Sequence, residues 1–408
     1  MKEIVKSPYF WVLSDQGVYS AYSFLSTLFA ARFLGVEDFG LYASLFIAIY
    51  FILSITNALV VMPFQVLLPD IEDRPGYISF LLLSLILIIS ILLSIGYLLN
   101  QYPANPFQIP SDLFINFAKL AMVFIIQDFS RKYLIATYKL KSAFWIDLSL
   151  ILCFGLFIIV WVKEGKTDLS AFINYLSLIY LLPITLALFF LRPKGNIILS
   201  FRTFTGMQWH QAKYLFISVF VQWWSSNLFI VGTGIFLSAK ALGIFRLVQS
   251  IFGVFNALFQ SIENYVIPEL SRRLKESNKE VKTYLIRIFK YLTAFAIPVF
   301  LLFVLFPEFI ITVAGGEEFS GNGFAVQMMA LVYMLIFSFF PLRILVRVYQ
   351  LNRSFFIAYS CSLILSLIFV NPLLSRFGLR GAFIGLMMNQ ICLAIYWYFS
   401  LNRLNRLK

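Results

Sequence analysis

The chain has 408 residues, of which 61% are hydrophobic and 12% are charged, and its mean hydropathy is +0.87. A soluble domain is much less apolar than this, so the composition excludes a soluble enzyme and indicates an integral membrane protein. The formal net charge is +13. We expect no nucleic-acid partner, because that charge has no folded soluble surface to act from.

Apolar stretches long enough to cross about 30 Å of hydrocarbon as helices recur along the whole chain. No soluble domain fits between them, and the N-terminal sequence MKEIVKSPYFW lacks a small-residue cleavage site, so the first stretch is predicted to be retained. The sequence predicts twelve spans, at residues 10–31, 40–62, 77–99, 113–134, 143–162, 171–191, 214–236, 243–267, 284–306, 324–345, 355–372 and 379–400.

The distribution of basic residues predicts the orientation. The N-terminus, the even-numbered loops and the C-terminus, with the adjoining ends of spans, carry 24 Lys and Arg residues, whereas the opposite loops carry 6. By the positive-inside rule, both termini are predicted to be cytoplasmic.

The two halves of the chain resemble each other. EDFGLYASLF (37–46) opens the second span and KALGIFRLVQ (240–249) opens the eighth, so that Gly40 matches Gly243. YKLKSAF (138–144) matches YQLNRSFF (349–356), and each follows an arginine, Arg131 or Arg343, at the cytoplasmic end of a span. This predicts two parallel six-helix repeats, a transporter architecture in which two bundles rock about a central cavity. The predicted parts are residues 1–191, an interfacial cytoplasmic linker at 192–213, and residues 214–408.

Polar residues form a stripe along the eighth predicted span. Their spacing of three and four residues places them on one face of a continuous helix over about 26 Å, nearly the full hydrocarbon thickness. Facing lipid, the charges alone would cost several kcal/mol, so the stripe is expected to face water or protein. Its members are Arg246, Gln249, Gly253, Asn256, Gln260 and Glu263.

The first span of each half carries a similar polar face. Gln16, Ser20 and Ser23 lie on the first span, and Gln222 and Ser226 lie on the seventh. We expect these side chains to line the cavity; the alternative is that they only allow the helices to pack closely.

Two carboxylates within spans are candidates for ion coupling. Asp15 and Glu263 could couple transport to a proton or sodium gradient through protonation in a buried setting. The alternative is a fixed ion pair or a carboxylate at a helix end. No other cofactor is expected, and the spacing of the three cysteines predicts neither a disulfide nor a metal site.

Four short motifs, in this order and spacing, resemble the polysaccharide transport branch of the multidrug/oligosaccharidyl-lipid/polysaccharide (MOP) flippase superfamily. They are ARFLGVEDFGLYA (31–43), VIPELSRRL (266–274), AGGEEFSGNG (314–323) and GLRGAFIGLMMNQ (378–390). The resemblance implies a bacterial inner-membrane flippase, similar to O-antigen flippases. Such a protein moves an undecaprenyl-pyrophosphate-linked oligosaccharide, an O-antigen or exopolysaccharide repeat unit, to the periplasmic leaflet by alternating access.

The resemblance also implies that cavity cations hold the pyrophosphate. Arg246, Lys119 and Arg32 are candidates, although snorkelling to the interface is an alternative for the last two. Few cations lie among the cavity candidates, and the second span lacks the stripe of the eighth. A polysaccharide polymerase and assembly proteins are expected as partners.

Two other functions remain open from the sequence. A drug antiporter of the same superfamily would share the fold but would favour acidic cavity residues. A polytopic polysaccharide polymerase would be an enzyme, and such enzymes usually place their catalytic groups on a large outer loop. The longest outer loop here, residues 307–323, contains no basic residue. We therefore expect a transporter and not an enzyme.

Overall fold

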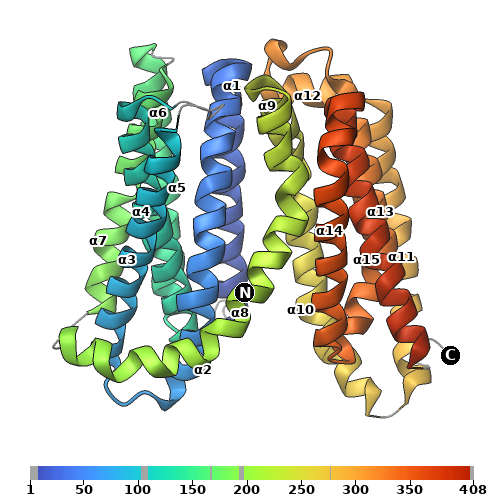
Figure 1. Ribbon diagram of the computed structural model, residues 1–408, viewed down its shortest axis with the longest axis horizontal. Helices are drawn as coiled ribbons and strands as arrows, with labels where there is room; N and C mark the ends of the chain where they lie inside the picture. The colour runs from blue at the N-terminus through green and yellow to red at the C-terminus, as the bar shows by residue number, and fades with distance from the viewer. Residues whose placement is uncertain (1–7, 103–108, 166–167, 193–196, 276, 405–408) are drawn as a thin grey trace. The chain divides into compact units, whose positions relative to one another are not determined.

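The computed structural model describes residues 8–102, 109–165, 168–192, 197–275 and 277–404, and all regular secondary structure in these residues is helical (Figure 1). Side-chain caps fix several helix starts: Asp73 accepts a hydrogen bond from the backbone N–H of Gly76, and Ser238 accepts one from Ala241. The helices of the first half are α1 (Pro8–Thr56), η1 (Asn57–Val61), α2 (Met62–Leu67), η2 (Leu68–Asp70), α3 (Arg74–Asn100), α4 (Ser111–Ala136), α5 (Leu140–Glu164), α6 (Leu169–Ile179) and α7 (Leu181–Leu191), and α8 (Ile197–Phe236) comprises most of the predicted linker and the seventh span. Those of the second half are α9 (Ala239–Ile251), α10 (Gly253–Leu274), α11 (Asn278–Leu305), α12 (Pro307–Gly315), η3 (Glu317–Phe319), α13 (Gly323–Val348), α14 (Asn352–Phe377) and α15 (Leu379–Arg403).

The helices account for the predicted spans. Ten helical stretches in the described residues are long and apolar enough to cross a membrane, and α9 with α10 forms a further, bent one. The first stretch, Phe10–Asp70, has 61 residues and a length of about 90 Å, about three times the hydrocarbon thickness. It is interrupted at Gly35, whose φ of 74° and ψ of 168° are not helical. Counted as two spans divided at Gly35, it brings the total to the expected twelve.

The chain forms two compact units. Unit 1 contains residues 1–26 and 45–220, and unit 2 contains residues 27–44 and 221–408. The predicted bundles follow chain order, whereas the units group residues by packing. Residues 27–44, around the break at Gly35, therefore lie in unit 2 although they belong to the first repeat.

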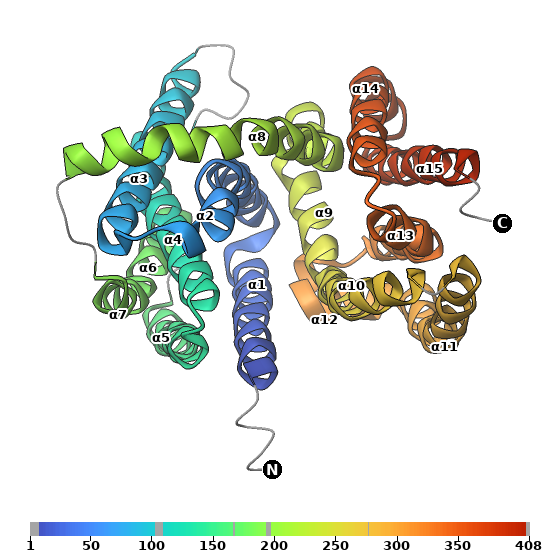
Figure 2. The same ribbon diagram turned by 90° about the horizontal axis from the view of Figure 1, so that it is seen from below.

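The core of unit 1 is built from aromatic residues on several helices. Tyr22 of α1 packs edge-on against Phe154 of α5 and against Tyr180, which joins α6 to α7. The first part of α8 crosses α3 at one end of the unit, where Phe204 packs against Tyr77 (Figure 2). Gln208 holds α8 there by donating to the carbonyls of Leu59 and Val60 at 2.9 and 3.0 Å. Part of the predicted linker is therefore an ordered helix packed on unit 1.

Unit 2 depends on a close crossing of two equivalent helices from the repeats. A Cβ on Gly40 would lie 1.9 Å from the carbonyl oxygen of Ala239, and a Cβ on Gly243 would lie 3.2 Å from the backbone nitrogen of Gly40. Both positions require glycine because the backbones approach so closely. The two glycines that align in the repeat thus meet in space.

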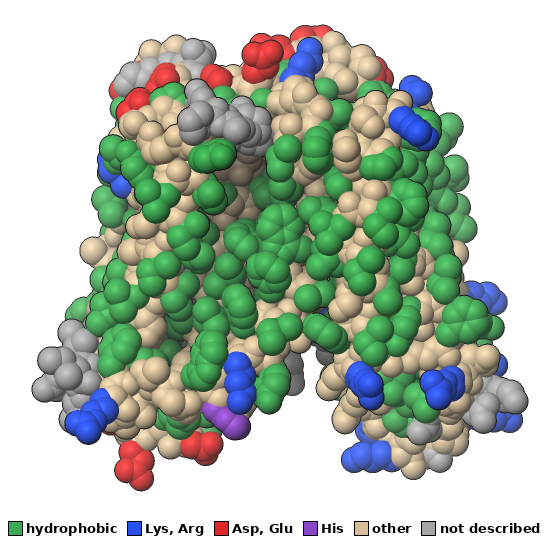
Figure 3. All heavy atoms as spheres, in the orientation of Figure 1, with side chains coloured by type: hydrophobic (Ala, Val, Ile, Leu, Met, Phe, Trp, Pro, Cys, Tyr) green, Lys and Arg blue, Asp and Glu red, His purple; other side chains and the backbone are tan. Residues whose placement is uncertain are grey.

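The surfaces of both units suit a bilayer. In each unit, hydrophobic side chains dominate the middle of the visible face, and charged side chains gather toward its ends (Figure 3). Many of the exposed side chains are large and apolar, such as Leu98 on α3, Leu156 on α5 and Phe295 on α11. A soluble protein would not expose so much contiguous apolar surface. This confirms the prediction of an all-helical, multi-pass membrane protein.

Candidate functional site

Unit 2 contains a polar cavity of about 440 Å³ within its own helices. Five of the residues predicted from sequence line it: Gln222, Ser226, Asn256, Gln260 and Glu263. They come from α8 and α10. The helical spacing of polar residues in the sequence predicts a polar face on each of these helices. The other lining residues, which the sequence does not predict, are Phe259, Ile336, Phe339, Phe340, Arg343, Arg347, Tyr359, Gln390, Leu393 and Trp397.

Two arginines on α13 supply the cationic side of this cavity. Arg343 and Arg347 are one helical turn apart and both reach the carboxylate of Glu263. Arg343 Nε lies 2.9 Å from Oε1, and Arg347 Nη1 donates to Oε2 at 2.6 Å. Glu263 is 5% exposed, so its charge depends on these partners. We call these three residues the Glu263 cluster.

The arginines of the Glu263 cluster carry a signal in the sequence. By the positive-inside rule both count as topological charges at the cytoplasmic end of the tenth span, and Arg343 is also an anchor of the repeat. Their spacing of four residues places both on the same face of a helix. That spacing is the feature from which the pair could have been found.

The predicted stripe along a continuous helix is wrong in one respect. The helix breaks at Phe252, where α9 ends and α10 begins with an angle of 45° between them. Phe252 is fully buried and packs against Phe303 and Tyr333. This aromatic packing is located at the bend. The stripe is therefore divided into Arg246 and Gln249 on α9, and the residues from Asn256 onward on α10.

The two parts of the stripe have different surroundings. Arg246 Nη1 donates to Gln249 Oε1 at 2.5 Å, and neither residue is among those that line the polar cavity. Asn256 does line it, and its amide nitrogen donates to the Tyr333 hydroxyl at 2.9 Å. The α10 part of the stripe thus carries the site that the structure describes.

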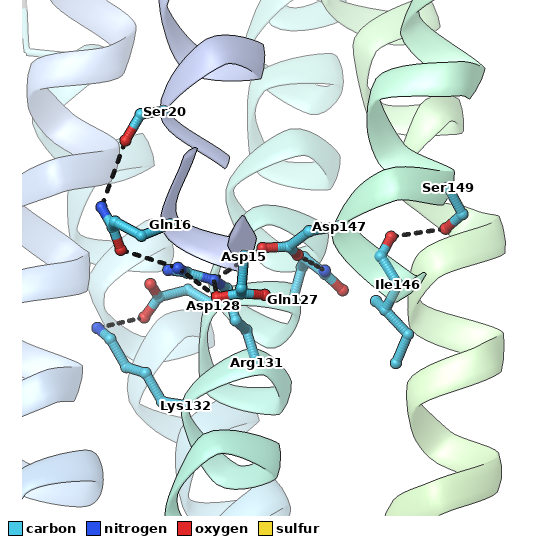
Figure 4. Close-up of polar contacts among 10 residues, drawn as sticks. All are labelled: Asp15, Gln16, Ser20, Gln127, Asp128, Arg131, Lys132, Ile146, Asp147 and Ser149. Carbon is cyan, nitrogen blue, oxygen red and sulfur yellow. Dashed lines mark hydrogen bonds and ion pairs between the residues drawn. The ribbon is translucent and has the colours of Figure 1, made fainter. Parts of the chain in front are cut away.

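Unit 1 contains a second buried ionic group, the Arg131 cluster, formed by Asp15, Gln127, Arg131 and Asp147. Figure 4 shows these side chains converging from α1, α4 and α5. Arg131 Nη2 lies 2.7 Å from Asp15 Oδ2, and Arg131 Nε lies 2.7 Å from Asp147 Oδ2. Asp15 and Asp147 are each 1% exposed. One guanidinium therefore balances two buried carboxylates.

Further contacts hold Arg131 in place. Its guanidinium donates to Gln16 Oε1 at 2.9 Å and lies 4.4 Å from the centre of the Tyr19 ring. Gln16 in turn donates to Ser20 at 3.3 Å. Gln16 and Ser20, both predicted to face substrate, thus join this cluster from the first helix.

The two clusters each place an arginine on the fourth predicted span of their half but differ in the sign of their net charge. Arg131 and Arg343 each precede the matched motif of their half, and each contacts a carboxylate on another helix of its own unit. The Arg131 cluster has two carboxylates and one guanidinium, whereas the Glu263 cluster has one carboxylate and two guanidinium groups. The Arg131 cluster thus has one more carboxylate than guanidinium, and the Glu263 cluster has one more guanidinium than carboxylate.

The remaining predicted residues contact other groups. Lys119 is exposed and donates to Asn116 Oδ1 at 3.1 Å. Arg32 donates to the carbonyl of Val313 at the end of α12, within unit 2. Ser23 lies on α1 and is half-buried. These contacts bring none of the three into the polar cavity of unit 2.

A further ion pair lies next to the Arg131 cluster on α4. Asp128 and Lys132 form a local ion pair at 2.6 Å. Arg131 instead contacts the carboxylates of Asp15 and Asp147. No group of three or more His, Cys, Asp or Glu side chains in the described residues could hold a metal ion.

Known proteins of similar fold are membrane transporters. The chain is similar to a multidrug resistance MATE family transporter of the MOP superfamily in an inward-facing conformation, with a TM-score of 0.71, 13% identity, and coverage of 95% of this chain and 94% of that chain. It is also similar to the lipid II flippase MurJ in an inward closed conformation, with a TM-score of 0.69, 15% identity, and coverage of 97% and 87%. A MOP superfamily transporter from Pyrococcus furiosus, described as having a binding pocket of reverse polarity, matches with a TM-score of 0.60, 13% identity, and coverage of 99% and 95%.

The sequence comparison identifies the family. No curated protein sequence matches the chain significantly. The model of the family described as polysaccharide biosynthesis protein matches residues 29–322, more than half of the chain. At these low identities, the structural similarities establish that the chain shares the MOP fold. The four short sequence motifs indicate the same fold. The chain therefore belongs to the polysaccharide biosynthesis protein family.

Proposed function

We propose that this protein is a flippase that moves an undecaprenyl-pyrophosphate-linked oligosaccharide from the cytoplasmic to the periplasmic leaflet of a bacterial inner membrane by alternating access. The main observation is the paired arginines, Arg343 and Arg347, in a cavity whose other polar lining, apart from their partner Glu263, consists of amides, hydroxyls and aromatic rings. A guanidinium can hold two phosphate oxygens at once. The family description, polysaccharide biosynthesis, supports a saccharide substrate.

The remaining lining of the cavity suits a sugar headgroup. Sugar hydroxyls and phosphate oxygens cannot enter hydrocarbon without replacement hydrogen bonds. The side chains of Gln222, Asn256, Gln260 and Gln390 offer amide donors and acceptors, and Trp397 contributes an aromatic ring to the wall. The cavity can thus replace water around the headgroup while the isoprenoid tail stays in lipid.

Glu263 gives the arginines a partner when no substrate is bound. Without it, two partly exposed guanidinium groups would lie side by side without a carboxylate partner. An arriving pyrophosphate competes with Glu263 for the same donors, so binding releases a carboxylate that can then take up a proton. We propose this exchange as the ion-coupling step, with the Arg131 cluster, which includes Asp15, as a second coupling site in unit 1.

The excess of carboxylate in the Arg131 cluster, like the fold similarity to a multidrug resistance MATE transporter, favours a cation-coupled drug antiporter. Arg131 already contacts both carboxylates and fills the space between them. An organic cation would have to displace this buried guanidinium. The cationic cavity of unit 2 therefore favours the flippase.

The two functions can be separated with purified protein in lipid vesicles. We expect saturable binding of an undecaprenyl-pyrophosphate-linked oligosaccharide that is lost in an R343Q/R347Q variant. The exposed pair Arg272 and Lys275, changed to glutamine, serves as the matched control and should leave binding unchanged. Binding of organic cations with no binding of the lipid-linked saccharide would instead identify a drug antiporter.

A further inference from the structure

A groove separate from the polar cavity runs between α14 and α15, with a volume of about 990 Å³. On α15, Gln390, Leu393 and Trp397 line the polar cavity, whereas the groove uses other faces of the same helix. The groove is lined by Arg353, Ser354, Ile357, Cys361, Leu365, Met388, Ile391, Cys392, Ile395, Tyr396, Phe399, Ser400, Arg403 and Leu404.

The groove is about as long as one leaflet of a bilayer is thick. On α14 its lining recurs every four residues from Arg353 to Leu365, a rise of about 18 Å. On α15 it extends from Met388 to Leu404, about 24 Å. Half of the hydrocarbon core is about 15 Å. A single acyl chain that enters from one membrane surface can therefore lie along it.

One end of the groove is cationic and the rest is apolar. α14 begins and α15 ends at the same side, which brings the exposed Arg353 and Arg403 to one mouth. Ser354 and Ser400 meet there with their hydroxyl oxygens 2.5 Å apart. No carboxylate is among the residues that line the groove. The described lining of the mouth thus carries two cations and no anion, and a phosphate would supply one.

We propose that this groove binds an anionic glycerophospholipid, with its phosphate between Arg353 and Arg403 and one acyl chain along the apolar part. A zwitterionic lipid would bring its ammonium group toward two guanidinium groups, and an apolar helix of a second copy would leave both of them without an anion. The transported lipid needs its pyrophosphate in the polar cavity, which lies on a different face of α15. The positive charge at this mouth predicts a lipid of the cytoplasmic leaflet.

The native cysteines provide the test. Cys361 and Cys392 line the groove, while Cys153 lies on α5 in unit 1; all three are half-buried. Purified protein is placed in bilayers of phosphatidylcholine with or without phosphatidylglycerol, and the rate of maleimide alkylation at each cysteine is followed by mass spectrometry. We expect phosphatidylglycerol to slow alkylation of the two groove cysteines at least fivefold and to leave Cys153 unchanged.

Two double variants make the test specific. R353Q/R403Q should abolish the protection, because the phosphate loses both guanidinium partners. R376Q/R380Q removes two exposed arginines from the opposite ends of the same helices and should retain it. Three results would overturn the proposal. They are equal protection in all three proteins, protection by phosphatidylcholine alone, and protection by an undecaprenyl phosphate but not by phosphatidylglycerol.

Discussion

At the scale of single residues, the account depends on what Glu263 and its two arginines do. Glu263 is buried and contacts both Arg343 and Arg347. A group held by two cations is a structural ion pair in the resting protein, which is the sequence-based alternative to ion coupling. The same arrangement also leaves two guanidinium groups available to any stronger anion. Both roles are compatible, because the substrate phosphate uses the donors that Glu263 gives up.

Substitutions of Arg347 should distinguish charge from geometry. We expect Arg347→Ala to weaken binding of the pyrophosphate-linked substrate about tenfold or more, since hydrogen bonds to charged groups contribute about 1.5–3 kcal/mol. Arg347→Lys should restore binding only in part, because an ammonium cannot bind two phosphate oxygens in a fork. Equilibrium binding in vesicles measures both. Full recovery by lysine would reduce the role of Arg347 to charge alone.

Stability should depend more on Arg131 than on its neighbour Lys132. Arg131→Gln leaves two buried carboxylates without their cation and should destabilise unit 1 by about 3–5 kcal/mol. Lys132→Gln removes a partly exposed lysine from one buried carboxylate, that of Asp128, and should cost less, about 1–3 kcal/mol. Thermal unfolding of both variants in one detergent provides the comparison. Similar unfolding temperatures would show that the Arg131 cluster is not structural.

The sequence predicts the polar positions better than their partners. Asn256, Gln260 and Glu263 follow the period of a helix, so their common face can be predicted from the amino-acid pattern alone. Arg131, in contrast, meets Asp15 from 116 residues away. Helical periodicity carries no information about which distant helix packs alongside. For the same reason, the arginines of α13 are counted in the sequence only as charges of the positive-inside rule. The sequence does not show that they line a cavity.

At the scale of whole elements, the crossing of α1 and α9 should tolerate no side chain. In Gly40→Ala the new methyl would overlap the carbonyl of Ala239, so the helices must separate, at a cost of about 1–3 kcal/mol. Gly155→Ala on α5 is the matched control. Nothing lies within 4 Å of its added carbon, and alanine favours a helix by up to about 1 kcal/mol. Unfolding temperatures should therefore move in opposite directions, and equal shifts would contradict the close crossing.

The bend between α9 and α10 predicts a pattern of chemical access. Cysteines at Asn256 and Gln260 should react with a water-soluble thiol reagent, because both positions line the polar cavity. A cysteine at Phe252 should be protected, because the phenylalanine is fully buried at the break. The rates are measured in a background without native cysteines. Uniform protection would remove α10 from any water-filled cavity.

The bend itself could not have been predicted from the polar pattern. The spacing of the stripe is continuous through Gly253, and a glycine alone does not end a membrane helix. The break follows from the aromatic packing of Phe252 against residues of α11 and α13. Only the tertiary structure brings these rings together.

At the scale of the whole molecule, the number of spans follows from composition, whereas the division into units does not. Apolar length and the repeat of Gly40 and Gly243 are enough to indicate twelve spans in two related halves. That residues 27–44 lie in unit 2 is a property of packing across the repeat. It depends on contacts such as the hydrogen bond from the backbone N–H of Val36 to Glu318, which sequence periodicity does not reveal.

The orientation in the membrane stays a prediction, and reporter fusions can test it. With 24 basic residues expected on the cytoplasmic side and 6 on the other, a fusion after residue 320 should report a periplasmic location and one after residue 277 a cytoplasmic location. The ratio of two reporters, one active only on each side, gives the measurement. A cytoplasmic signal at 320 would contradict the proposed topology.

The central claim is that the protein moves a lipid-linked saccharide by holding its pyrophosphate with Arg343 and Arg347. The most direct measurement is the fraction of lipid-linked oligosaccharide in the outer leaflet, determined with a membrane-impermeant sugar-modifying reagent on cells that lack the chain or carry a restored copy. The account predicts that the native chain restores outer-leaflet labelling and that R343Q/R347Q, inserted at the same level, leaves the saccharide on the cytoplasmic side. Equal labelling with and without the chain would contradict it.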